Sequence, residues 1–365
     1  MTEVTTARKR PARPLPVRIH RWLSLAAAAF WLIQAATGVL SVFHWELEDA
    51  GVPGAHRPTD LAAINRRLGI LAPEGSGRRI ISVWTTAGAP DRYDVTVAEG
   101  ERERAVRIAG DGTVLRDKGE GERGAMGTIV AIHQELLAGD AGGWIVGVSG
   151  LLLCTNLILG LVVAWPKRGW WRRSLTPAGK GPLVARLYSW HRAIGLWAVV
   201  PALFLVGAGV LLKFEDGTAK LIGAKPVAAP PVSAFAGQSV GFAVAVRAAI
   251  AAVPGSQLTA VAMPAADKPV YRIRVLAPGE RRRAYGTTTI FVDAGTGTVR
   301  SVARADAAPP ARAFMDGLYA VHTGEFSGLA GRLLVLALGL WLAAMIVMGV
   351  LLWWRRRPRP GRERS

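Results

Sequence analysis

The sequence is almost without cysteine: its one residue, Cys154, falls within an apolar run. A single cysteine excludes an internal disulfide, and no CxxCH motif is present for covalent attachment of a c-type haem. The chain also has no cysteine set that would bind zinc or an iron–sulfur cluster. Cys154 is therefore interpreted as a small packing residue.

Several nucleotide-binding and hydrolytic motifs are missing as well. The chain has no P-loop, no HExxH and no GxSxG. We expect no nicotinamide, flavin or ATP domain.

Acidic residues are scarce: 26 Asp and Glu stand against 45 Lys and Arg, which gives a net charge of +19. A charge of this size can indicate a nucleic-acid partner. Most of it, however, lies in residues 1–21, 166–187 and 355–365, where only Glu3 and Glu363 are acidic. Each of these segments flanks an apolar run, which is the positive-inside pattern of membrane proteins. We therefore expect a lipid bilayer as partner and no nucleic acid.

Four apolar runs are long enough to cross a bilayer, which takes roughly 20 helical residues. They are residues 22–43, 144–165, 188–213 and 329–354. The first run is longer than the apolar part of a signal peptide and does not end at small residues. It is therefore interpreted as a retained helix.

The charge distribution predicts the orientation of these spans. The basic segments 1–21, 166–187 and 355–365 are expected to be cytoplasmic, so residues 44–143 and 214–328 lie on the other side. Each outer segment contains a helical stretch followed by short strands with glycine turns. These stretches are residues 60–71, 93–97, 105–108 and 113–115 in the first segment, and 241–253, 270–275, 287–292 and 298–299 in the second.

An internal repeat is the most informative feature of the chain. In each half, one histidine lies 18 residues before a span glycine, and a second lies 27 residues before another. The pairs are His20 and Gly38, His191 and Gly209, His133 and Gly160, and His322 and Gly349. This pattern predicts a tandem duplication about a pseudo-twofold axis along the membrane normal. The predicted fold is a membrane α-helical, four-helix bundle with two small extracytoplasmic α+β domains.

Four of the six histidines occupy duplicated positions. The axis places His20 opposite His191 near the cytoplasmic face, and His133 opposite His322 near the outer face. Two imidazoles on opposite faces of one flat cofactor suit haem used for electron transfer, because both axial positions on iron are filled. The alternative is that they are ordinary interfacial residues. The repeated glycines would let a porphyrin or a neighbouring helix approach the backbone.

Other residues near the spans are further candidates. His44 leaves the first span on the outer side and is an alternative ligand to His133. Arg21 and Arg192 follow the inner histidines, and Arg332 opens the fourth span, so each is a candidate partner of haem propionates. Positive-inside anchoring explains Arg21 and Arg192 equally well.

A set of short motifs follows in order from His20 to about Arg357. They are His20-Arg21-Trp22, Thr37-Gly38-Val39-Leu40, His133, Gly160-Leu161, Trp165-Pro166, Trp190-His191-Arg192, Gly195-Leu196-Trp197, His322-Thr323-Gly324-Glu325-Phe326, Gly331-Arg332-Leu333-Leu334 and Gly349-Val350-Leu351. With the strand and turn of residues 291–299, this series resembles the PepSY-associated transmembrane proteins, also called iron-regulated or PiuB-like membrane proteins. The two halves differ after the outer histidine, since His133 is followed by Gln134-Glu135-Leu136-Leu137.

The resemblance implies a bacterial inner-membrane protein whose outer segments are PepSY units. Some members are di-haem reductases that release iron from ferric siderophores. It therefore implies two non-covalent b-type haems, a ferric siderophore or other ferric chelate as substrate, and a separate electron donor, either quinol or a cytoplasmic reductase. On this interpretation, electrons pass from the haem of His20 and His191 to that of His133 and His322, and no catalytic acid or base is needed.

Two other classes of function stay open. A non-enzymatic protein whose PepSY units bind peptides or restrain a peptidase would need neither a cofactor nor the four histidines. A transporter component for iron chelates is disfavoured, because the spans hold almost no acidic residues, which ion-coupled carriers usually place there.

Overall fold

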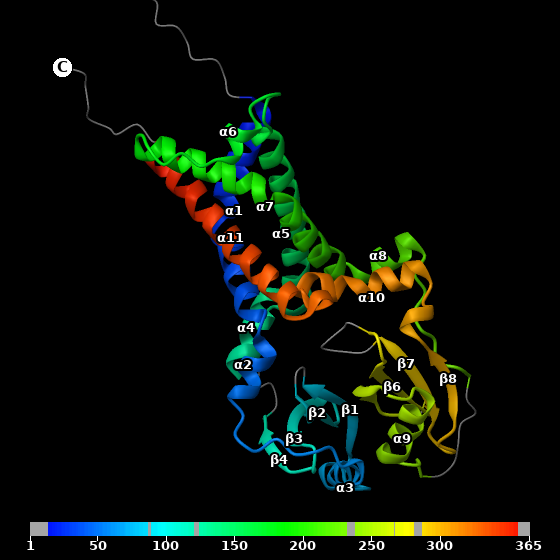
Figure 1. Cartoon of the computed structure of the whole chain (residues 1–365). Helices are drawn as coiled ribbons and strands as arrows, with labels where there is room; N and C mark the ends of the chain where they lie inside the picture. Colours follow the sequence, from blue (N-terminus) through cyan, green and yellow to red (C-terminus); the bar gives the residue numbers. More distant parts are fainter. Residues whose placement is uncertain are drawn as a thin grey trace, which may run out of the picture.

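The computed structural model describes residues 14–86, 89–119, 124–231, 238–265, 267–280 and 287–356. In this part of the chain a bundle of long helices lies at one end and an antiparallel sheet at the other (Figure 1). Short helices connect the two.

The bundle consists of α1 (Leu15–Ser41), α5 (Gly139–Ala164), α7 (Leu183–Lys213) and α11 (Gly328–Arg355). All four are long and apolar enough to cross a bilayer, so the structure has four candidate membrane helices, the number that the sequence predicts. Helices α1 and α7 each pack against both α5 and α11, so the four helices close a ring. Large apolar side chains such as Phe204 and Leu333 are exposed on the outside. This is expected where lipid is the solvent.

Helix α1 begins earlier than the apolar run predicts. It starts at Leu15, directly after Pro14, with Pro16 in its first turn. Proline is well tolerated there because the first N–H groups of a helix have no partner within it. The apolar run therefore marked the apolar part of the helix and not its start.

Short helices surround the ends of the bundle. They are α2 (His44–Ala50), α4 (Gly124–Glu135), α6 (Trp171–Leu175), α8 (Glu215–Ile222) and α10 (Pro310–Thr323), with 3₁₀ turns at Ala305–Ala307 and Glu325–Ser327. Helices α8 and α10 extend sideways from the bundle at its sheet-side end (Figure 1). Every exposed residue of α10 is apolar: Pro310, Ala313, Phe314 and Val321. An exposed helix face of this kind is typical of contact with lipid.

The sheet has eight antiparallel strands in the order β4-β3-β2-β1-β5-β6-β7-β8. They are β1 (Arg78–Thr86), β2 (Ala89–Glu99), β3 (Arg102–Ala109), β4 (Val114–Asp117), β5 (Gln257–Ala262), β6 (Val270–Leu276), β7 (Thr288–Asp293) and β8 (Val299–Ala303). The two outer segments meet where β1 pairs with β5, with Val83 opposite Val261. The two predicted α+β domains thus share one continuous sheet.

The two strands at this junction were missed by the sequence pattern. Strand β1 contains the run Ile80-Ile81-Ser82-Val83-Trp84, and β5 is short and rich in alanine, so neither alternates cleanly. A central strand pairs with a neighbour on each of its two edges. It therefore tolerates a sequence without clean alternation, because packing against these neighbours also determines that the segment forms a strand.

One face of the sheet is covered by α3 (Leu61–Leu71) and α9 (Phe242–Ala252), which lie on the side away from the bundle (Figure 1). The core beneath them draws on both halves, with Tyr93 from β2 and Tyr271 from β6 almost fully buried. Each phenol satisfies its polar end with a hydroxyl, on Thr59 and Ser239 respectively. The sheet and its two helices therefore form a single core.

The turn from β7 to β8 is organised by Asp293, whose side chain is 6% exposed. Its Oδ1 accepts hydrogen bonds from the N–H groups of Gly295 and Thr296, both at 2.9 Å. Its Oδ2 accepts from Arg300 at 2.8 Å. The Arg300 guanidinium, together with these N–H groups, holds the pKa of Asp293 at about 2.

We expect Asp293→Asn to destabilise the protein at neutral pH but not in strong acid. A carboxyl whose pKa is lowered by folding contributes stability above its unfolded pKa of about 3.9, and loses it as pH falls to about 2. The difference in unfolding free energy should reach at most about 2.6 kcal/mol at pH 7 and narrow between pH 4 and pH 2. Thermal unfolding of both proteins across this range measures it. A difference that does not change with pH would contradict the ion pair as its cause.

Candidate functional site

The structure brings His133 of α4 and His322 of α10 together at the sheet-side end of the bundle. Their ring centroids lie 6.2 Å apart, and the ring planes are inclined by 26°. These two residues are called the sheet-side pair below. They lie far apart in sequence, and each is carried by a short helix that packs against the long helices.

His20 of α1 and His191 of α7 line a cavity of about 270 Å³ within the bundle. They are called the loop-side pair, because the loop between α5 and α7 lies at this end. The other walls come from α5 and α11, so all four long helices contribute. The cavity is lined mainly by apolar residues, among them Leu157, Leu196 and Trp341.

Each of the four histidine rings lies against one of the repeated glycines, and always on a different helix. A Cβ atom built on each glycine would meet the Cε1 atom of the ring. The distances are 2.6 Å for Gly209 and His322, 3.0 Å for Gly38 and His133, 3.1 Å for Gly160 and His20, and 3.6 Å for Gly349 and His191. The repeated glycines therefore make room for imidazole rings. From the sequence, a porphyrin or a neighbouring helix was predicted to lie against them.

The same geometry orients the rings through backbone carbonyls. The Nδ1 atoms of His133, His322 and His20 lie 3.1, 2.9 and 3.1 Å from the carbonyl oxygens of Gln34, Leu205 and Asn156. Each carbonyl belongs to the residue four positions before the glycine that the ring contacts. In a helix this oxygen already accepts the N–H of the glycine, and its second lone pair stays accessible because glycine has no side chain.

These contacts determine the tautomer of the rings. A carbonyl only accepts hydrogen bonds, so Nδ1 carries the proton and donates it. Nε2 then has a free lone pair, which is the state in which a neutral imidazole binds a metal ion. Nδ1 of His191 is buried and has no hydrogen-bond partner among the described residues.

Polar side chains inside the bundle support these rings and were not identified from the sequence. Asn156 is 6% exposed, and its Nδ2 donates to the Ser24 hydroxyl at 2.8 Å. Gln34 donates from Nε2 to the carbonyl of Ile132, next to His133, at 3.4 Å. Placing a polar amide within an apolar span costs free energy, so polar residues there often mark a functional position. Asn156 could therefore have been identified as a candidate site residue from the sequence.

Arginines gather around the loop-side cavity. Arg21 and Arg192 line it, as does Arg356, which was not predicted from the sequence. Arg192 donates to the carbonyl of Ala164 at 3.3 Å, and the Arg356 guanidinium lies 5.2 Å from the centre of the Tyr188 ring. Pairing of Arg21 and Arg192 with propionates stays a prediction, and Arg356 joins them as a third candidate.

Arg332, whose pairing with a propionate stays a prediction, has partners within the protein. It is 2% exposed and donates to both carboxylate oxygens of Glu46, at 2.6 and 2.7 Å. It also donates to the carbonyl of Val42 and stacks on the Phe43 ring at 4.2 Å. The guanidinium therefore joins α11 to the end of α1 and to α2, and pairing with a propionate would require breaking this ion pair.

His44 stays a predicted alternative ligand to His133, and its ring has partners close by in the chain. Its Nδ1 lies 2.6 Å from the Ser41 carbonyl, and its ring contacts Trp45. His56 lies on the surface beside Asp91. The partner that the structure gives to His322 is His133.

The chain after each sheet-side histidine turns with left-handed backbone, although the sequences differ. Gly324 has φ of 80°, a conformation that glycine adopts freely. In the first half Leu136 and Leu137 have φ of 54° and 61°, which is uncommon for residues with a side chain. The sequence difference after His133 therefore changes the strain of the turn and not the position of the histidine.

The described residues contain no group of three or more His, Cys, Asp or Glu side chains that could hold a metal ion. The histidines that meet do so in pairs. A pair alone is too few for a typical protein-bound zinc or calcium ion.

The fold and these sites define an integral membrane protein: four membrane-spanning helices that carry two histidine pairs, joined to an antiparallel sheet domain outside the bundle. Its sequence matches the family model of the PepSY-associated TM region over residues 17–356. The chain belongs to this family. No curated protein matches the sequence at a significant level.

Proposed function

We propose that the chain is a di-haem b-type oxidoreductase that passes electrons across a bacterial inner membrane to a ferric chelate. The observation that carries this proposal is the 6.2 Å separation of the His133 and His322 rings. With metal–nitrogen bonds of about 2 Å and a centroid about 1.2 Å behind Nε2, two trans imidazoles have centroids roughly 6.4 Å apart. The observed spacing fits one iron between two rings.

The donor set also fits haem better than a free metal ion. Two neutral imidazoles supply two ligands, and a porphyrin supplies the other four in its plane. The hydrogen bonds from Nδ1 fix the rings of His133, His322 and His20 in the tautomer that leaves Nε2 available. At the loop-side end, the apolar cavity and its three arginines suit a flat apolar group with anionic substituents.

The two halves support an origin by tandem duplication. Each half contains, in order, a long helix, two short helices, four strands, a short helix and a second long helix. The pairing of β1 with β5, the first strands of the two halves, is antiparallel and therefore compatible with a twofold axis between them. We assign the two halves of the sheet as PepSY units on this basis.

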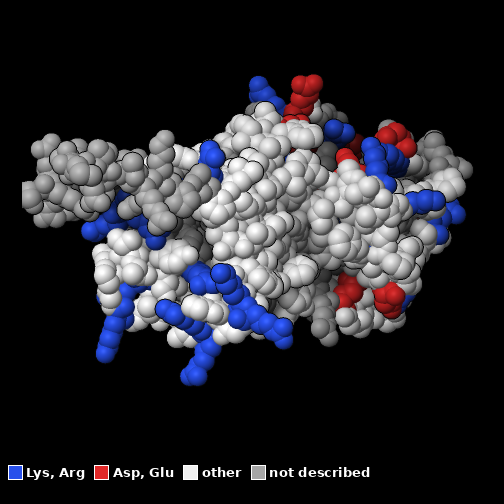
Figure 2. Space-filling view, turned by 90° about the horizontal axis from the view of Figure 1, so that it is seen from above, with Lys and Arg blue, Asp and Glu red and all other residues white. Residues whose placement is uncertain are grey.

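The direction of transfer follows from charge. In Figure 2, which looks onto the loop-side end, lysine and arginine side chains stand out on the left without acidic side chains among them. The positive-inside rule assigns such an end to the cytoplasm. Haem supplies one-electron chemistry at iron, and the residues of this chain hold and orient it. The donor is a quinol or a cytoplasmic reductase, and the acceptor is a ferric siderophore or another ferric chelate on the sheet side.

An absorption spectrum of the purified full-length protein, with a pyridine haemochromogen count, tests the proposal. We expect two low-spin b-type haems per chain. His191→Ala and His322→Ala should each reduce the count to one, while His56→Ala, at an exposed position, should retain two. No haem after expression with ample haem supply would overturn the proposal and favour a peptide-binding or regulatory protein.

A further inference from the structure

Thr37 lies beside the proton-bearing nitrogen of a sheet-side histidine. Its Oγ1 is 3.3 Å from Nδ1 of His133, and the residue is 8% exposed. The hydroxyl proton is already donated to the helix, because Oγ1 lies 2.8 Å from the carbonyl oxygen of Ile33. The oxygen therefore meets His133 with its lone pairs and acts as an acceptor.

His133 thus has two acceptors for one N–H group. The carbonyl of Gln34 lies at 3.1 Å from Nδ1 and the Thr37 hydroxyl at 3.3 Å. Among the described residues, none of the other three paired histidines has a side-chain hydroxyl hydrogen-bonded to Nδ1. The sheet-side pair is therefore chemically unequal.

The second half provides a natural comparison. Gly209 takes the place of Gly38 against its ring, and the residue before it is Ala208, where the first half has Thr37. Ala208 is 5% exposed and lies in the same helical position relative to the Leu205 carbonyl that His322 uses. The two rings therefore differ by one hydroxyl group.

We propose that Thr37 is a positioning residue that lowers the redox potential of the sheet-side site through His133. This inference rests on the proposed function. An acceptor at Nδ1 increases the basicity of the ligand nitrogen on the other side of the ring. A more basic ligand stabilises the ferric over the ferrous state, which lowers the midpoint potential. A more strongly reducing sheet-side site suits an acceptor as difficult to reduce as a stable ferric chelate.

Thr37 also bonds to the preceding turn of its own helix, as threonines in apolar helices commonly do. If that bond were its whole role, replacement would alter stability without altering potential. The two roles are thus separable by a redox measurement.

The experiment is a potentiometric titration of haem-loaded full-length protein, comparing wild type with Thr37→Val and Thr37→Ser. Valine keeps the shape and removes the acceptor, so one of the two midpoint potentials should shift upward while the other stays. Serine keeps the acceptor and should restore the wild-type value. Ala208→Thr adds an acceptor beside His322 and should shift the same potential downward.

The outcomes of the redox titration separate this inference from the proposed function. Two haems with unchanged potentials in Thr37→Val would overturn this inference and leave the proposed function standing. Absence of haem from the wild-type protein would overturn both. If Thr37→Val does not retain haem, Ala208→Thr decides: a downward shift supports the inference, and no shift overturns it.

Discussion

Alanine at position 209 is expected to abolish the sheet-side site and leave the loop-side site intact. The added Cβ would lie 2.6 Å from Cε1 of His322, closer than such atoms approach in real proteins. The ring cannot simply retreat, because its Nδ1 is held by the Leu205 carbonyl at 2.9 Å. Overpacking of this kind costs about 1–3 kcal/mol, and it displaces the ring from its alignment with His133. The haem count of Gly209→Ala should fall from two to one.

Two glycines provide controls for this experiment. Gly207 lies on the same helix with nothing within 4 Å of an added Cβ, so Gly207→Ala should keep both haems and gain slightly in helix propensity. Gly349 would place its Cβ 3.6 Å from His191, an ordinary contact, and its alanine variant should also keep both. A full haem count in Gly209→Ala would show that the ring does not need this space.

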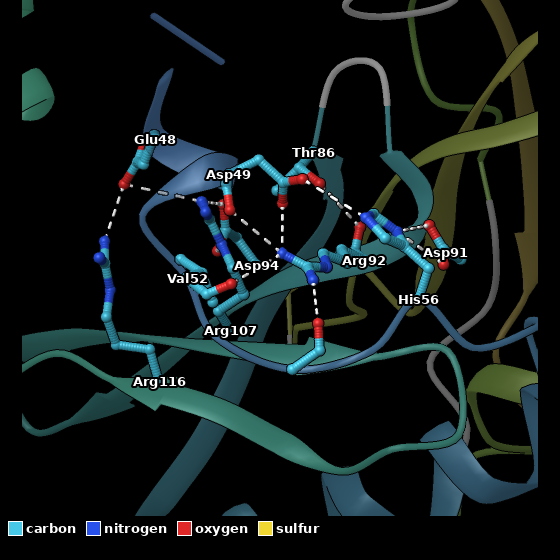
Figure 3. A network of polar contacts seen from close by, with 11 residues as sticks. Glu48, Asp49, Val52, His56, Thr86, Asp91, Arg92, Asp94, Arg107 and Arg116 are labelled. Carbon is cyan, nitrogen blue, oxygen red and sulfur yellow. Dashed lines mark hydrogen bonds and ion pairs between the residues drawn. The ribbon is translucent and has the colours of Figure 1, made fainter. Parts of the chain in front are cut away.

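Replacement of Arg92 by methionine is expected to destabilise the protein strongly. Arg92 is 3% exposed, and Figure 3 shows it at the centre of a polar network. It donates to the carboxylate of Asp49 at 2.8 Å and to the carbonyls of Val52 and Gly54 at 3.3 and 2.6 Å. Methionine fills similar volume but leaves these acceptors without their donor. Breaking such a buried pair costs about 3–5 kcal/mol.

Ion pairs of α2 connect the sheet to the bundle. Helix α2 carries three acidic residues, and each is paired with a different part of the molecule. Glu46 is paired with Arg332 of α11, and Asp49 with Arg92 of β2. Glu48 is paired with Arg116 of β4 and with Lys118, which directly follows that strand. Loss of Arg92 therefore loosens the attachment of the sheet as well as the loop that follows α2.

Thermal unfolding of the full-length protein, followed by circular dichroism in the β region, measures this effect. Arg78→Met is the matched control, since its pair with Glu99 is exposed, with side chains 40% and 59% accessible. An exposed pair contributes only about 0–1 kcal/mol, so this variant should unfold close to the wild type. Equal unfolding temperatures for the two variants would contradict a structural role for the Arg92 network.

Several features of the molecule were predictable because they depend on local sequence. Four spans follow from the length and apolarity of four runs, and the bilayer imposes that requirement on each helix separately. The repeat identified the histidines and glycines that the structure brings together, since duplicated spacing is visible without any knowledge of contacts. The motif order also identified the family, which the match over residues 17–356 confirms.

Features that depend on contacts between distant elements were not predictable. The ion pair of Arg332 with Glu46 joins residues at opposite ends of the chain, and nothing near either one indicates the other. Strands β1 and β5 do not alternate cleanly between apolar and polar residues. Their pairing into one sheet is therefore visible only in the tertiary structure.

The four paired histidines were predictable from the sequence in one respect and not in another. The sequence alone determined which residues are special: four histidines, four glycines and the spans that carry them. Only the tertiary structure decided that each glycine receives a ring from another helix, and that the carbonyl four residues earlier orients it. The reason is physical: spacing along one helix determines which residues share a face, but the partner of that face depends on how the helices pack.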